Sequence, residues 1–148
     1  MAIDFPASPT LNQEYTFEGR TWTYNNTGWT VKNVPVNYLP VSRSVSIASP
    51  SATEKLVLGY FTIAQTITII ESIVLGTTPS VTFSIRYGTD VSLSGTEVVT
   101  GGITCTNSTN GLSTTVFNNS SIPINNFVWL TTSAVTGTVN SLNISVVF

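Results

Sequence analysis

Residues 81–87 read VTFSIRY, and this stretch decides the fold class of the chain. Apolar and polar side chains alternate along it with a period of two, which is the pattern of a β-strand with one buried face. Shorter alternating runs lie on both sides of it, separated by clusters of Gly, Asn, Ser and Thr that are typical of turns. Strong helix-forming residues are scarce throughout the chain. We therefore predict an all-β protein built from antiparallel strands.

Residues 41–148 hold about eight such strands, and their spacing predicts a sandwich, which we expect to be jelly-roll-like. The expected strands lie around Val45 and Ile47 and in the ranges 59–70, 73–75, 81–87, 97–100, 103–106, 113–117, 127–131 and 142–148. The range 59–70 is expected to be one long or bent strand with Ile63 facing inward. We expect a turn at 76–80, and Asn110-Gly111 predicts a hairpin between its flanking strands. The expected core comprises Phe83, Ile85, Phe127, Trp129, Leu142 and Ile144.

Residues 1–33 form a distinct aromatic segment. Three short runs in it alternate and share faces in pairs, namely Tyr15 with Phe17, Trp22 with Tyr24, and Trp29 with Val31. The gaps between the runs have turn chemistry, so we predict a three-stranded antiparallel meander that follows an extended, proline-containing arm. A sheet this small has little area of its own, and we expect that residues 1–33 cannot bury their aromatic rings internally. Residues 34–40 contain two prolines and predict a stiff linker before the sandwich.

The composition excludes several classes of function. The 148 residues include no His and one Cys, so a Cys-His zinc site, a Ser-His-Asp nucleophile and an intrachain disulfide cannot be built. Five Lys and Arg against seven Asp and Glu leave no basic patch for nucleic acid. No stretch is apolar enough to span a membrane, and the N-terminus has no signal-peptide pattern. We expect a protein that is made in a cytoplasm and that has no cofactor, no metal, no nucleic-acid partner and no membrane partner.

The carboxylates offer little support for an enzyme. A pair of them would be needed for glycoside hydrolysis, but none lies in a recognisable motif. Arg86, Tyr87 and Asp90 border a Gly-containing loop that is a candidate ligand loop, but an outward strand residue and its loop are the favoured explanation. Asp90 alone supplies too few oxygen ligands for a calcium site. We therefore expect no catalytic activity, with a glycan-active enzyme as the least favoured alternative.

The aromatic cluster of residues 1–33 has three possible roles. Its rings suit stacking on sugars, a small core of the segment itself, or contact with another subunit. Only 8% of the residues are charged, while the chain has 18 Ser, 25 Thr and 13 Asn. Hydroxyl and amide groups cost less to desolvate than charges do, and interface cores are depleted of charge. This composition favours a protein that assembles with other chains.

The N-terminal segment contains FPASPT at residues 5–10, QEYTF at 13–17, EGR at 18–20, TWTY at 21–24 and Gly28-Trp29. With these motifs it resembles a module found near the N-terminus of many tailed-bacteriophage virion proteins, including tail fibres and accessory structural proteins. The usual pattern has a glycine near the position of Asn12, which is a departure. Residues 60–69, 81–88, 122–130 and 142–148 resemble β-sandwich domains of phage structural proteins.

The resemblance implies a non-enzymatic virion structural protein, most simply a capsid decoration or cement protein that is anchored by its N-terminal arm. Its partners would be capsid or other virion proteins, and it would form a homo-oligomer, with a trimer favoured. The alternative is a tail-fibre or receptor-binding protein that recognises host surface glycans. The residues expected to contact the partner are Phe5, Pro6, Pro9, Tyr15, Phe17, Trp22, Tyr24 and Trp29.

Overall fold

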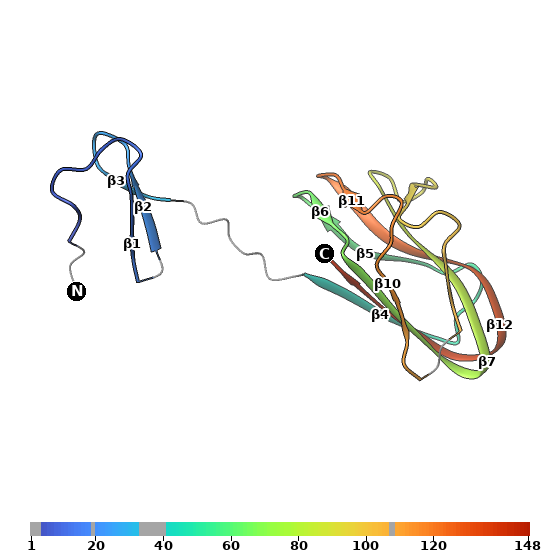
Figure 1. Cartoon of the computed structure of the whole chain (residues 1–148). Helices are drawn as coiled ribbons and strands as arrows, with labels where there is room; N and C mark the ends of the chain where they lie inside the picture. Colours follow the sequence, from blue (N-terminus) through green and yellow to red (C-terminus); the bar gives the residue numbers. More distant parts are fainter. Residues whose placement is uncertain (1–3, 19, 33–40, 107–108) are drawn as a thin grey trace. The chain divides into compact units, whose positions relative to one another are not determined.

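The computed structural model describes residues 4–18, 20–32, 41–106 and 109–148. The chain divides into two compact units, residues 1–39 and 40–148 (Figure 1). The linker expected at 34–40 lies outside the described residues. The described part contains strands and no helix, and all paired strands are antiparallel, which confirms the predicted all-β class.

The first unit contains the predicted meander. Its three strands pair in the order β1-β2-β3. They are β1 (Glu14–Phe17), β2 (Arg20–Tyr24) and β3 (Trp29–Val31). The turn between β2 and β3 is held by Asn25, whose side-chain oxygen accepts hydrogen bonds from the backbone N–H groups of Thr27 and Gly28 at 3.1 and 2.9 Å. An Asn in this position bonds to the backbone that follows it and so closes the turn locally.

The register of the meander separates its two faces by chemistry. Tyr15 pairs with Trp22, and Trp22 pairs with Val31, so these side chains point to the same side of the sheet. Since every second residue shares a face, all the aromatic residues of the three strands lie on this one side. The opposite side carries threonines, with the hydroxyls of Thr16 and Thr21 2.9 Å apart.

The second unit is a β-sandwich. Two strands in it are far longer than the rest, namely β7 (Ile69–Gly88) and β12 (Asn126–Val147). The shorter strands are β4 (Ser42–Ala48), β5 (Lys55–Phe61), β6 (Gln65–Thr66), β8 (Thr96–Glu97), β9 (Ile103–Cys105), β10 (Leu112–Thr114) and β11 (Ser121–Ile122). β6 and β11 pair with each other outside the main sheet.

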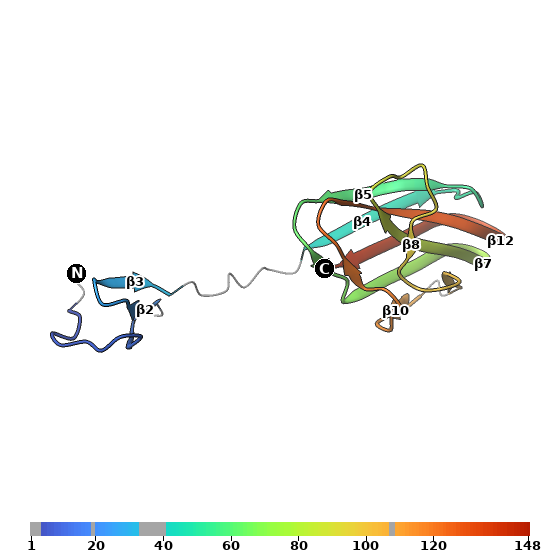
Figure 2. The ribbon, with the colours of Figure 1, turned by 90° about the horizontal axis from the view of Figure 1, so that it is seen from above.

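Both layers of the sandwich share the two long strands. β7 and β12 pair along their whole length and turn together through a bend (Figure 1). On one side of the bend they are flanked by β4 and β10, and on the other by β5, β8 and β9. The edge strands β4 and β5 lie on the same side of the sandwich (Figure 2). A single folded ribbon therefore supplies the middle of both layers.

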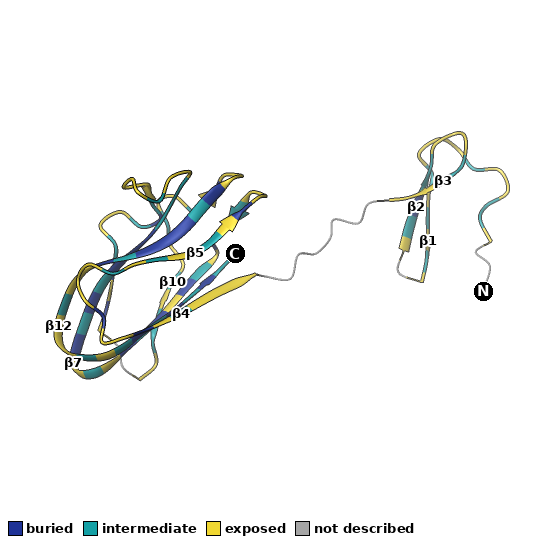
Figure 3. Cartoon of the chain, turned by 180° about the vertical axis from the view of Figure 1, so that it is seen from behind, coloured by how far each residue is buried: buried dark blue, intermediate teal, exposed yellow. Residues whose placement is uncertain are grey.

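The core lies between these layers and contains side chains from both. Val74 and Leu142 come from one layer, Phe83 and Leu130 come from the other, and all four are fully buried in one cluster. Figure 3 shows buried stretches on β7 and β12, while β4 is exposed along much of its length. The predicted antiparallel sandwich with an N-terminal meander is confirmed.

The bend corrects the turn that was expected at 76–80, because β7 continues through these residues. The pairing of β7 with β12 shifts register three times between Thr132 and Ser141. Bulges of this kind bend a strand without ending it. Gly137 has a φ of 75°, and a Cβ built on it would lie 2.0 Å from the carbonyl oxygen of Thr78. Gly137 therefore allows the backbones of β7 and β12 to approach each other closely at the bend.

Two further expectations about strands are wrong. The range 59–70 is divided among β5, β6 and the start of β7, and Ile63 is exposed. Among the described residues, the strands that flank Asn110-Gly111 do not pair with each other: β9 and β10 both pair with β7, one in each layer. Asn110-Gly111 favours a tight turn locally, but the pairing of the flanking strands depends on context. Both of them pair with the long strand β7 instead of with each other.

Five of the six expected core residues are buried in the sandwich, and the sixth, Phe127, is not. Phe83, Ile85, Leu142 and Ile144 belong to the central cluster. Trp129 is buried but lies outside this cluster, because it pairs with Arg86 on the outer face of its layer. Phe127 is half-buried and packs on the exposed Tyr60, with 4.7 Å between ring centroids.

Candidate functional site

The N-terminal module, residues 4–32, builds an aromatic cluster around Phe5. The Phe5 ring stacks on Trp29 with 5.1 Å between centroids, and it meets Tyr15 and Trp22 edge-on at 5.5 Å each. Tyr24 adds a tilted contact with Trp29 at 5.6 Å. Stacked and edge-on arrangements are the favoured geometries of aromatic pairs. The arm therefore contributes the ring that covers the aromatic face of the meander.

Backbone hydrogen bonds bring the arm back to the sheet. Asn12 donates its N–H to the carbonyl of Tyr24 at 2.9 Å, and Tyr24 donates its own N–H to the carbonyl of Gln13 at 3.0 Å. The Gln13 side chain accepts a hydrogen bond from the N–H of Thr10 at 2.9 Å. Asn12 has a φ of 65°, a conformation that Asn tolerates better than most residues. Asn at this position, where a glycine was expected, is therefore compatible with the turn.

The expectation that residues 1–33 cannot bury their aromatic rings is wrong. Trp22 is only 8% exposed, and the other aromatic residues of the module are half-buried, as are Pro6 and Pro9. The large apolar side chains that stay exposed are Val31, on the aromatic face, and Leu11, in the turn before β1. Of the roles considered for the cluster, a small core of the module itself is the one that these contacts show.

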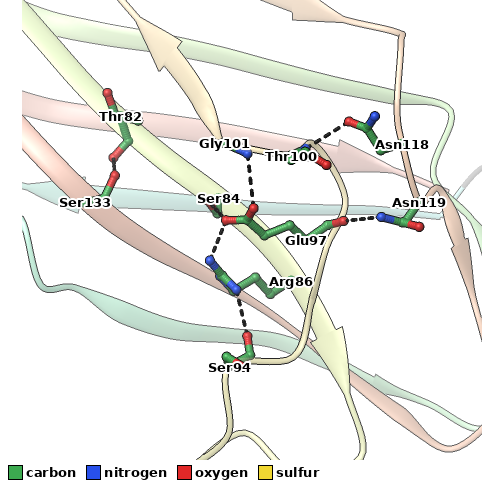
Figure 4. Close-up of polar contacts among 10 residues, drawn as sticks. All are labelled: Thr82, Ser84, Arg86, Ser94, Glu97, Thr100, Gly101, Asn118, Asn119 and Ser133. Carbon is green, nitrogen blue, oxygen red and sulfur yellow. Dashed lines mark hydrogen bonds and ion pairs between the residues drawn. The ribbon is translucent and has the colours of Figure 1, made fainter.

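Glu97 is the centre of a polar network on the sandwich (Figure 4). Its carboxylate accepts hydrogen bonds from the Gly101 N–H at 3.1 Å and the Ser84 hydroxyl at 3.0 Å, and it forms an ion pair with Arg86. The Gly101 bond, followed by those from Ser84 and Arg86, lowers the pKa of Glu97, against partial burial that raises it. The ionised Glu97 carboxylate therefore links β7, β8 and the loop 98–101 through these contacts. Its role is structural.

The candidate ligand loop after β7 also has a structural role. Asp90 accepts hydrogen bonds from the hydroxyl and the N–H of Ser92, and these lower the pKa of its carboxyl group. Lys55 reaches the carbonyl of Val91, and its Nζ lies 5.5 Å from the centroid of Trp129. A Cβ on Gly95 would lie 2.4 Å from the Trp129 ring. The loop therefore covers the indole, and its glycine permits the close contact.

Across the described ranges, no cluster of three or more His, Cys, Asp or Glu side chains that could hold a metal ion occurs. The same residues contain no helix long and apolar enough to cross a membrane.

No known protein family, no curated protein and no solved structure matches this chain.

Proposed function

We propose that this chain is a non-enzymatic structural protein of a tailed-phage virion, made in the host cytoplasm, and that it decorates the capsid as a cement protein. The resemblance of residues 5–29 to the N-terminal module of phage virion proteins supports the virion assignment. The low share of charged residues, 8%, supports a surface that packs against other chains. A homo-oligomer, with a trimer favoured, suits the symmetry of a shell.

The main observation in support of this proposal is that the chain divides into two compact units. Every residue of the sandwich core cluster lies between Ile47 and Phe148. Among the described residues, this core cluster is therefore built from the second unit alone. A separate module with its own aromatic cluster is well suited to binding a partner.

The module has two features that a neighbouring protein could use. β1 and β3 are the edges of its sheet, so their outer backbone groups are open to pairing with a strand from another chain. Val31 and Leu11 are 59% and 56% exposed and would be covered by such a partner. The aromatic rings would then hold the docking surface rigid rather than insert into the shell protein.

The test is to add purified chains to phage particles that lack the protein, to sediment the particles and to count the bound copies. The full-length chain is expected to saturate the shell, whereas the chain 41–148 should stay folded and remain in the supernatant. Val31→Asp in the full-length chain should also lower the occupancy, because it places a charge on the exposed apolar edge. Val116→Asp is the matched control, since Val116 is 83% exposed on the sandwich.

Equal occupancy by the full-length and truncated chains would remove the anchoring role of the module. A copy number that follows the symmetry of the tail rather than that of the shell would contradict the cement role and support a tail-fibre protein.

A further inference from the structure

The outer face of one layer of the sandwich contains a groove of about 550 Å³. Three neighbouring strands, β4, β12 and β7, form its floor, and residues 109–111 form part of its wall. Small-molecule sites commonly have volumes of roughly 300–1,000 Å³. The outer face of the other layer differs, because the loop after β7 covers it at Trp129.

Cross-strand pairing arranges the floor of the groove in two rows. Ser44 pairs with Ser145, which pairs with Glu71. The second row contains Ser46, Asn143 and Ile73 in the same order. Neighbouring strands lie about 4.8 Å apart, so each row presents side chains at that spacing. The Ser44 hydroxyl donates a hydrogen bond to that of Ser145 at 3.0 Å, which orients the first row.

The groups in the groove select for a neutral, hydroxyl-rich ligand. Among the described residues, the lining contains no Lys or Arg and Glu71 is its one charged residue, so an anionic ligand would be repelled. The Glu71 side chain is exposed, and no donor from the described part of the chain is bonded to its carboxylate. A carboxylate accepts hydrogen bonds strongly from hydroxyl groups, while serine and asparagine can both donate and accept. Ile73 is half-buried and offers an apolar contact for C–H groups.

We propose that this groove binds a neutral saccharide. Glu71 would accept hydrogen bonds from two sugar hydroxyls, Asn143 and Ser46 would bond a neighbouring hydroxyl, and Ile73 would contact the C–H face of the ring. The groove lies on the sandwich, so this site does not depend on where the N-terminal module anchors the chain. On a decorated particle, many weak sites of this kind would act together on a polysaccharide surface.

The test is a titration of the ¹⁵N-labelled full-length protein, followed by the amide signals in NMR spectra. The probes are three neutral trisaccharides, mannotriose, cellotriose and triacetylchitotriose, and one anionic trisaccharide, trigalacturonate. At least one neutral probe should shift the amides of residues 44–46, 71–73 and 143–145 saturably, with a Kd of about 1–10 mM. Trigalacturonate should leave them unchanged at the same concentrations, because of the Glu71 charge.

A matched pair of variants locates the site. Ser46→Arg places a long side chain in the groove and should weaken binding by about tenfold or more. Ser42→Arg adds the same side chain to the same face of β4 but outside the groove lining, and should leave the affinity unchanged. Glu71→Gln keeps the shape but removes the charge, and should weaken binding by about tenfold.

Three outcomes would overturn the proposal. One is the lack of groove shifts with all three neutral probes at about 20 mM. Another is shifts confined to the aromatic face of residues 15–31, which would assign sugar stacking to the N-terminal module instead. The third is tighter binding of trigalacturonate than of the neutral probes. Ser46→Arg should not change the occupancy of particles, so failure of the saccharide site is distinguishable from failure of the cement role.

Discussion

The N-terminal module and the sandwich are both antiparallel β-structures, but they are stabilised by different side chains. The longest strand of the module has 5 residues, whereas β7 and β12 have 20 and 22. The module relies on aromatic rings that meet on one face beneath Phe5. The sandwich relies mainly on β-branched and leucine side chains enclosed between two layers.

The difference follows from the area that each sheet can cover. A three-stranded sheet has no second layer, so its apolar face needs large rings and a cap supplied by the chain itself. A ribbon of two long strands that folds over on itself supplies both layers and encloses small apolar side chains completely. We therefore expect that the two units respond separately to substitution.

Phe83→Ala should have the largest effect and should act on the sandwich alone. Phe83 is fully buried in the central cluster, and large-to-small core substitutions of this type cost about 3–5 kcal/mol. Urea unfolding followed by far-UV circular dichroism measures the loss. Thr82→Ala, in the same strand but on the opposite face, should cost no more than about 1 kcal/mol. A loss below about 1 kcal/mol for Phe83→Ala would contradict the observed register, because it would place this side chain outside the core.

Gly137→Ala should have the next largest effect and tests the bend that gives the sandwich its two layers. Gly137 has a φ of 75°, and the added Cβ would meet the carbonyl oxygen of Thr78 at 2.0 Å. Backbone strain of this kind costs on the order of 1–3 kcal/mol, and the steric clash adds to it. Gly101→Ala is the control, since Gly101 has a φ of 84° but nothing within 4 Å of the added Cβ. Equal losses of unfolding free energy in the two variants would show that close packing at the bend is unimportant.

Phe5→Ala should act on the module and leave the sandwich intact. Each aromatic pair contributes about 0.5–1.5 kcal/mol beyond burial, so losing the three contacts of Phe5 should cost on the order of 2 kcal/mol. Because the meander is small, we expect its amide signals to move toward random-coil values while those of residues 41–148 stay in place. Leu11→Ala is the control, as Leu11 is 56% exposed. Movement of the sandwich signals in Phe5→Ala would show that the two units are coupled.

Glu97→Gln should have the smallest effect, through the pH dependence of the sandwich. The pKa of Glu97 is lowered in the folded state, so its ionised form contributes stability above the unfolded pKa of about 4.3. That contribution is lost as the pH falls through the folded pKa. At pH 7 the variant should be less stable by about 1 kcal/mol, and the difference should shrink in acid. Glu71→Gln, at an exposed position, is the control and should cost less than Glu97→Gln at pH 7. A stability difference for Glu97→Gln that stays constant with pH would contradict the assigned contacts.

The candidate site was only partly predictable. The aromatic residues of the module could be recognised from alternation alone, since neighbouring strands align their faces locally. The position of Phe5 over Trp29 could not, because it depends on how the arm folds back through Asn12 and Gln13. For the groove, the sequence shows only polar residues at alternate positions, namely 42, 44 and 46 and again 141, 143 and 145. The floor of the groove forms because these two strands are neighbours in the sheet, which the sequence does not show.

The sequence by itself determined the all-β class, the meander and the strand at 81–87, because side-chain alternation and turn chemistry act between residues close in the chain. Only the tertiary structure decided that β7 and β12 continue through a bend, that β9 and β10 both pair with β7, and that Trp129 faces outward beneath a loop. The physical reason is that bulges, pairing partners and covered faces are set by backbone groups and side chains far apart in sequence. Local patterns specify that a segment is extended, but contacts across the fold select its partner.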